Sequence, residues 1–193
     1  TLGIEHLDHV FLTHHHADQC SGLHSFKSGE QNNTTSIHAP AGEEHFLKPE
    51  NSRQLSAPEF KYNRGCPPSY SIPPGGIPNI DYSIMTGFEQ FLWKGKRLRF
   101  LHTPGHGPNA CSLLIDHKGK QIVFCGDALH DGGTIWEPYH LEWDHWTGTG
   151  ALASWEGISR LEGVAIDYLC PSHGPIITEK PHEQLALVKK RLM

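Results

Sequence analysis

Short apolar segments that run directly into polar residues recur along this chain, and this pattern constrains its fold more than any other feature. The first predicted strand, residues 7–13, is followed at once by His14-His15-His16-Ala17-Asp18. Later predicted strands end at the segment 102–107, at Asp127 and at His173. Polar clusters at strand ends are typical of folds in which strands and helices are interleaved. The pattern therefore predicts the α/β or α+β class.

Hydrophobic periodicity and turn residues predict the other elements. Strands are expected at 36–39, 90–93, 97–102, 111–116, 121–125 and 164–170, with 111–116 and 121–125 joined as a hairpin through residues 117–120. A helical turn is expected near 42–48 and a helix over 151–161, with Leu152, Trp155 and Ile158 on its apolar face. The last helix is expected to begin at Thr178 as N-cap and to bury Leu185, Val188 and Leu192.

One long segment, residues 49–80, differs in composition because it holds seven of the fourteen prolines. We expect a long irregular loop there and not a separate domain. Since 193 residues suit one domain with a sizeable core, the prediction is a single domain over residues 1–193.

The first polar cluster predicts a metal site. In an extended segment alternate side chains share one side, so His14, His16 and Asp18 can converge while His15 points elsewhere. Two imidazoles and a carboxylate suit Zn, Mn or Fe in the divalent state. In the second cluster, either His102 or His106 could bind metal on these grounds alone.

Charge and cysteine usage exclude some partners. The formal net charge is −5 and the one basic run is Lys189-Lys190-Arg191, which argues against nucleic acid and anionic membranes. No stretch is long and apolar enough to cross a membrane. Five cysteines without close pairing favour a reduced compartment, so a cytoplasmic location is expected, with a lost N-terminal signal as the alternative. The oligomeric state stays open.

The order of motifs resembles the metallo-β-lactamase superfamily of hydrolases. H-x-H-x-D at 14–18 is followed by T-P-G-H at 103–106, F-x-G-D at 124–127 and S-H-G at 172–174. The resemblance implies an α+β fold, an αββα sandwich with metals at one edge. It implies one or two divalent ions, Zn first and Mn or Fe as alternatives. The implied ligands are His14, His16 and His106 for one ion, Asp18 and His173 for the other, and Asp127 as a bridge.

The same resemblance implies a catalytic role for Asp127, and for Asp18 as a group that orients the attacking hydroxide. It makes His102 structural. Two departures from the family pattern are visible: Gln19 stands where the family has histidine, so it becomes a candidate ligand of a weaker second site. Only six residues precede the first predicted strand, so we expect the family's N-terminal strands to be missing from this chain.

The aromatic-rich loop 128–148 supplies the candidate substrate contacts His130, Trp136 and Tyr139. Together these features predict a metal-dependent hydrolase of a small-molecule ester, thioester, lactone or related bond. Two alternative functions remain open. One is a mononuclear iron oxygenase like the superfamily's persulfide dioxygenases, and the other is a non-catalytic metal-binding domain.

Overall fold

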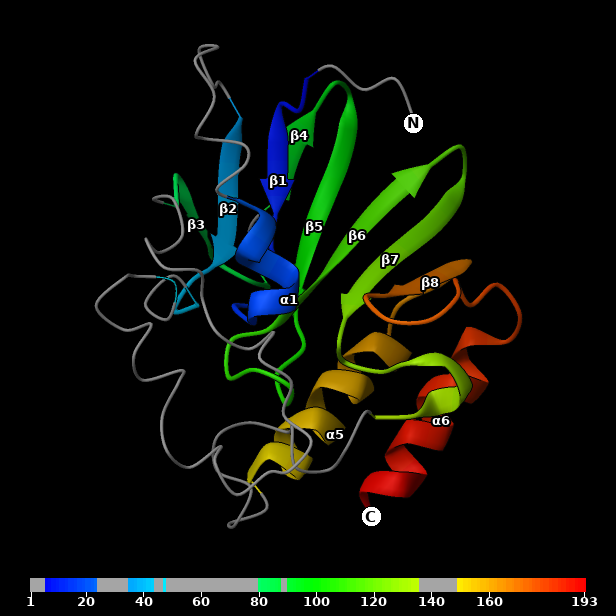
Figure 1. Cartoon of the computed structure of the whole chain (residues 1–193). Helices are drawn as coiled ribbons and strands as arrows, with labels where there is room; N and C mark the ends of the chain where they lie inside the picture. Colours follow the sequence, from blue (N-terminus) through cyan, green and yellow to red (C-terminus); the bar gives the residue numbers. More distant parts are fainter. Residues whose placement is uncertain (1–5, 24–34, 44–46, 48–79, 88–89, 136–148) are drawn as a thin grey trace, which may run out of the picture. The chain divides into compact units, whose positions relative to one another are not determined.

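The chain forms two compact units, Thr1–Ile84 and Met85–Met193, in a computed structural model (Figure 1). The structure describes residues 6–23, 35–43, 47, 80–87, 90–135 and 149–193. The predicted loop at 49–80 therefore lies almost wholly outside the described residues, as do the candidate substrate contacts Trp136 and Tyr139. A single domain over the whole chain stays a prediction.

The first unit holds a three-stranded parallel sheet in the order β1 (His9–Phe11), β2 (Ser36–Pro40) and β3 (Tyr82–Ile84). The helix α1 (Ala17–Cys20) and a short 3-10 turn, Ser21–Leu23, follow β1. Central strands of parallel sheets are buried on both faces, which accounts for the run of buried residues from Ile37 to Pro40 in β2. The core of this unit consists of Leu12, Cys20, Leu23, Ile37, Ala39 and Leu47.

The second unit holds a five-stranded sheet in the order β4 (Gln90–Trp93), β5 (Lys96–His102), β6 (Cys111–His117), β7 (Lys120–Gly126) and β8 (Tyr168–Pro171). Neighbouring strands are antiparallel except β7 and β8. The two hairpins turn at Lys94-Gly95 and Lys118-Gly119, where all four residues have positive φ. Positive φ at both central residues is what a two-residue type I′ turn requires. The predicted hairpin is confirmed, with a tighter turn than expected.

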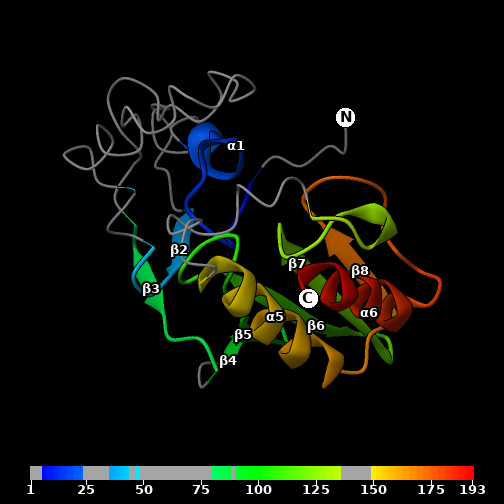
Figure 2. The same cartoon turned by 90° about the horizontal axis from the view of Figure 1, so that it is seen from below.

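Two helices, α5 (Thr149–Glu162) and α6 (Pro181–Leu192), lie side by side on one face of the five-stranded sheet (Figures 1 and 2). Their apolar residues join those of the strands in one core, made of Leu114, Val123, Cys125, Leu129, Ile158, Leu161, Leu169, Ile177, Leu185 and Val188. The predicted α+β class is confirmed by this combination of sheets and helices.

The apolar face predicted for α5 is right for Ile158 and wrong for Leu152 and Trp155. Leu152 is 70% exposed and Trp155 is 39% exposed, whereas Ser154, Gly157 and Ile158 are buried. Hydrophobic spacing misled the prediction because the buried stripe of α5 consists largely of small residues. Small side chains allow α5 to approach Thr103 and Pro104 closely.

Other boundaries also differ from the prediction. β8 begins at Tyr168 and not at residue 164, and Asp167 just before it accepts a hydrogen bond from the backbone N–H of Gln121 at 2.8 Å. The last helix starts at Pro181, and its N-cap is Lys180 and not the predicted Thr178. Proline is favourable in the first turn of a helix. The strand β3 was not predicted. Within the described residues, no helix has the length and apolar character needed to cross a membrane.

Candidate metal centre

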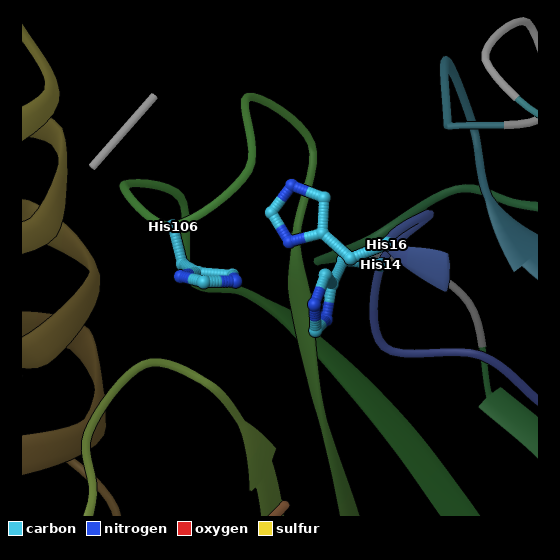
Figure 3. Close-up of side chains that lie close together, drawn as sticks. All are labelled: His14, His16 and His106. Atoms are coloured by element: carbon cyan, nitrogen blue, oxygen red, sulfur yellow. The ribbon is translucent and has the colours of Figure 1, made fainter. Parts of the chain in front are cut away.

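In the first unit, His14 and His16 lie on the loop between β1 and α1 (Figure 3). The rings of His14 and His16 lie with centroids 4.8 Å apart at 90° to one another. His14 is buried, and its Nδ1 is 3.0 Å from the hydroxyl of Thr13, while His16 is partly exposed. The predicted juxtaposition of these two imidazoles within one unit is therefore present.

Asp18 is exposed and lies on α1, not on an extended segment, since the chain turns into a helix at Ala17. The alternation argument used for Asp18 is wrong for that reason. The backbone N–H groups of Gln19 and Cys20 donate to the carbonyl of His16 and form the first turn of the helix. The side-chain amide of Gln19 donates to Asp18 Oδ2 at 2.9 Å. Gln19 thus fixes the carboxylate of Asp18.

The ring of His15 lies with its centroid 4.7 Å from that of His16, but the hydrogen bonds of His15 go to Glu43. It is fully buried, its backbone N–H donates to Glu43 Oε2 at 2.9 Å, and its Nδ1 forms a short hydrogen bond to the same oxygen. Its carbonyl accepts from the thiol of Cys20 at 3.2 Å. Glu43 is also fully buried. No local sequence pattern indicates Glu43, because its contact partner lies 28 residues away.

In the second unit, His106 sits on the turn that follows β5 (Figure 3). It is 7% exposed, and its Nε2 lies 3.2 Å from Asp127 Oδ2. Gly105, with φ of 131°, makes the turn at this point. His102 is the last residue of β5, and both of its ring nitrogens form hydrogen bonds, to Arg160 and to the carbonyl of Pro108.

Asp127 follows β7 directly. The register between β7 and β8 shifts at Phe124 and Gly126, and Gly126 has φ of 57°, so the chain leaves the sheet there. The carboxylate of Asp127 is buried, and its Oδ2 lies 3.7 Å from Nε2 of His173, which is half exposed. One buried carboxylate thus has imidazoles from two other strand ends beside it.

His130 is buried on the loop after Asp127, and its ring stacks on that of His173 with centroids 5.4 Å apart. Whether it contacts substrate stays a prediction. Cys125 and Cys170 lie near this cluster, but burial raises the pKa of both thiols, most strongly for Cys125. Such burial fits the predicted packing role of these thiols.

Each unit thus carries imidazole and carboxylate side chains that could serve as ligands of a divalent metal ion. Imidazole with carboxylate is a donor set suited to Zn, Mn or Fe. The chemistry such a set permits is activation of water near neutral pH.

Comparison with known proteins finds a family whose model matches nearly the whole chain. A family model described as the metallo-beta-lactamase superfamily matches residues 2–173. An atrochrysone carboxyl ACP thioesterase from Aspergillus chevalieri is 31% identical over 103 residues. That alignment covers 53% of this chain and 29% of the fungal protein, so the chain matches under a third of that relative's length.

Solved structures show the same fold. An archaeal metallo-beta-lactamase superfamily protein from Sulfolobus tokodaii gives a TM-score of 0.69 at 21% identity, over 98% of this chain and 70% of that one. A beta-lactamase domain protein from Burkholderia ambifaria gives 0.69 at 20% identity, over 95% of this chain and 54% of that one. These likenesses confirm the predicted metallo-β-lactamase-like fold.

Proposed function

This chain belongs to the metallo-beta-lactamase superfamily, and we propose on that basis that it is a metal-dependent hydrolase of a small-molecule ester, thioester or lactone. The observation that carries the proposal is the buried carboxylate of Asp127 with two imidazoles beside it. Nε2 of His106 and Nε2 of His173 lie 3.2 and 3.7 Å from Asp127 Oδ2. A buried carboxylate beside imidazoles fits a cation site, because charges in protein interiors are paired or coordinate metals.

Two ions would divide the ligands between them. His14, His16 and His106 would hold one, and Asp18, Asp127 and His173 the other, with Asp127 as the ligand shared by both. This grouping is supported by the donor types and by the family, whose match spans both units. Zinc suits the donor set best, with manganese and iron as alternatives.

When bound, such ions lower the pKa of a coordinated water and polarise the substrate carbonyl. The chain's own contribution is to orient the groups around the reacting atoms. Gln19 fixes the carboxylate of Asp18 through its 2.9 Å hydrogen bond, so that Asp18 can orient the attacking water and accept its hydrogen bond. His130, stacked on His173, is the described residue we propose as a substrate contact.

Gln19 would weaken the second site relative to the first. A neutral amide is a poorer ligand than imidazole for these metals, and in this chain its donor group is directed to Asp18. We propose that Gln19 acts through Asp18 and contributes little as a ligand itself.

Among bond types, the fungal relative named as an acyl-carrier-protein thioesterase supports a thioester. The formal charge of −5 supports a small-molecule substrate over nucleic acid. We therefore place thioesters first among the substrates to be tried.

The test is hydrolysis of a small panel by zinc-loaded protein: an acyl-N-acetylcysteamine thioester, a p-nitrophenyl ester and a γ-lactone. We expect turnover of at least one, lost on chelation and in Asp127→Ala. Asp116→Ala, which removes an exposed carboxylate of β6, is the matched control and should keep the wild-type rate. Turnover that survives in Asp127→Ala would overturn the proposal.

A further inference from the structure

The turn that carries His106 is closed by its own backbone. The N–H of Thr103 donates to the carbonyl of Ala110 at 2.9 Å, and the N–H of Gly105 donates to that of Gly107 at 3.1 Å. The hydroxyl of Thr103 also bonds to that of Ser112 at 3.0 Å. These contacts shape the turn but do not fix its position on the molecule.

His102 links this turn to α5. Its Nδ1 lies 2.9 Å from Nη1 of Arg160, and its Nε2 lies 3.2 Å from the carbonyl oxygen of Pro108, inside the turn. A guanidinium can only donate and a carbonyl can only accept. The ring of His102 must therefore be neutral, with its proton on Nε2, for both hydrogen bonds to form.

Arg160 binds the backbone at the same point. Its Nη1 donates to the carbonyl of His102 at 3.1 Å as well as to the ring. Its other nitrogen, Nη2, lies 3.6 Å from Glu156 one helical turn earlier, an exposed pair. Arg160 therefore joins α5 to the end of β5 through two acceptors of one residue.

The helix also lies directly against the backbone of the turn. A Cβ placed on Gly157 would stand 2.7 Å from the carbonyl oxygen of Pro104, and one on Gly105 would stand 2.5 Å from Cα of Ser154. Such close approach is available only where side chains are absent or small. The turn and α5 are thus packed backbone to backbone.

We propose that Arg160 and His102 are positioning residues that hold the His106 imidazole in place as a metal ligand. The proposal rests on the proposed function, since it assigns His106 a ligand role. Arg160 anchors His102, His102 anchors the turn at Pro108, and the turn carries His106 four residues further on. Residues beyond the first ligand sphere that orient ligands typically change metal affinity by about 10–100-fold.

The experiment measures zinc affinity by competition with a chromophoric chelator, together with the unfolding temperature of the metal-free protein. Arg160→Met removes both hydrogen bonds to His102, and His102→Phe keeps a planar ring but loses both of its bonds. We expect each to weaken the tightest zinc site roughly tenfold, at the lower end of that range because neither residue touches the ligand. Arg160→Lys keeps a donor and should recover part of the loss.

Glu156→Gln is the matched control, because it removes the exposed pair with Arg160 and leaves the bonds to His102 intact. It should bind zinc as the wild type does. Wild-type zinc affinity in both Arg160→Met and His102→Phe, with a lowered unfolding temperature, would overturn the positioning role alone. A wild-type protein that takes up no zinc would instead overturn the proposed function and this inference with it.

A second measurement needs no metal and no substitution. The ¹⁵N shifts of the His102 ring in metal-free protein should show a neutral imidazole with its proton on Nε2. A proton on Nδ1 would exclude the bond from Arg160 to the ring and would overturn the proposal.

Discussion

Glu43 and His15 form a fully buried pair in the first unit. Glu43 Oε2 accepts from the backbone N–H of His15 at 2.9 Å and bonds to its Nδ1 as well. A buried carboxylate is costly unless it is hydrogen-bonded and paired. Because His15 stands between His14 and His16, this pair fixes the backbone that presents both candidate ligands.

We expect Glu43→Ala to lower the free energy of unfolding by about 3–5 kcal/mol, since it leaves a buried polar partner uncompensated. Glu43→Gln keeps an acceptor and should cost less, roughly 1–2 kcal/mol. Urea unfolding of metal-free protein measures both. Asp8→Ala, which removes the carboxylate of a partly exposed pair with His6, should cost under about 1 kcal/mol. A Glu43→Ala variant as stable as Asp8→Ala would show that the buried pair contributes nothing.

The close packing of α5 against Pro104 makes a second prediction. In Gly157→Ala the new Cβ would meet a carbonyl oxygen at 2.7 Å and backbone atoms of Thr103 at 3.0 and 3.1 Å. Overpacking of this kind costs about 1–3 kcal/mol and should displace the His106 turn. Gly163→Ala, whose Cβ would meet Arg160 O at 3.4 Å, is the control. Thermal unfolding should separate the two variants, and equal unfolding temperatures would contradict the close approach.

A third prediction concerns acid stability. His38 is buried on β2, stacked between Phe11 and Tyr82, with its Nε2 3.1 Å from Nδ1 of His9. Burial, reinforced by His9 and opposed by Asp81, lowers the pKa of His38 from 6.5 to about 4. Between pH 6.5 and about 4, His38 is therefore protonated in the unfolded chain but neutral in the folded chain.

The contribution of neutral His38 to the free energy of unfolding is consequently present above the unfolded pKa of 6.5. It is lost as the pH falls towards about 4. It amounts to at most about 3 kcal/mol. His38→Phe keeps the stacking and removes the titration, so its unfolding free energy should fall less steeply over this range. Parallel pH profiles for variant and wild type, measured by urea unfolding, would rule out this role.

The sequence predicted well those features that depend on local patterns. The strands β4 to β7 were placed within a residue or two, because they are short apolar stretches bounded by glycine, proline or lysine-glycine turns. The positions of His106, Asp127 and His173 at strand ends follow from the same signals. The ligand assignment itself came from the resemblance to the family.

What the sequence could not predict depends on contacts between distant residues. Arg160 meets His102 across 58 positions, and Glu43 meets His15 across 28, with no local pattern to connect them. The buried face of α5 was missed because Ser154 and Gly157 carry no hydrophobic signal, yet only small residues fit against the turn. β3 was missed because three residues, Tyr82–Ile84, are too few to show a period.

The most direct test of the central claim is metal content per chain, measured by plasma mass spectrometry on untagged protein purified without added metal. We expect about two zinc or manganese ions per wild-type chain, as in other two-metal hydrolytic sites, with loss of both in Asp127→Ala and retention in Asp116→Ala. A single iron per chain would support an oxygenase in place of the hydrolase. No metal, with none taken up on addition, would contradict the claim that this chain assembles a metal centre.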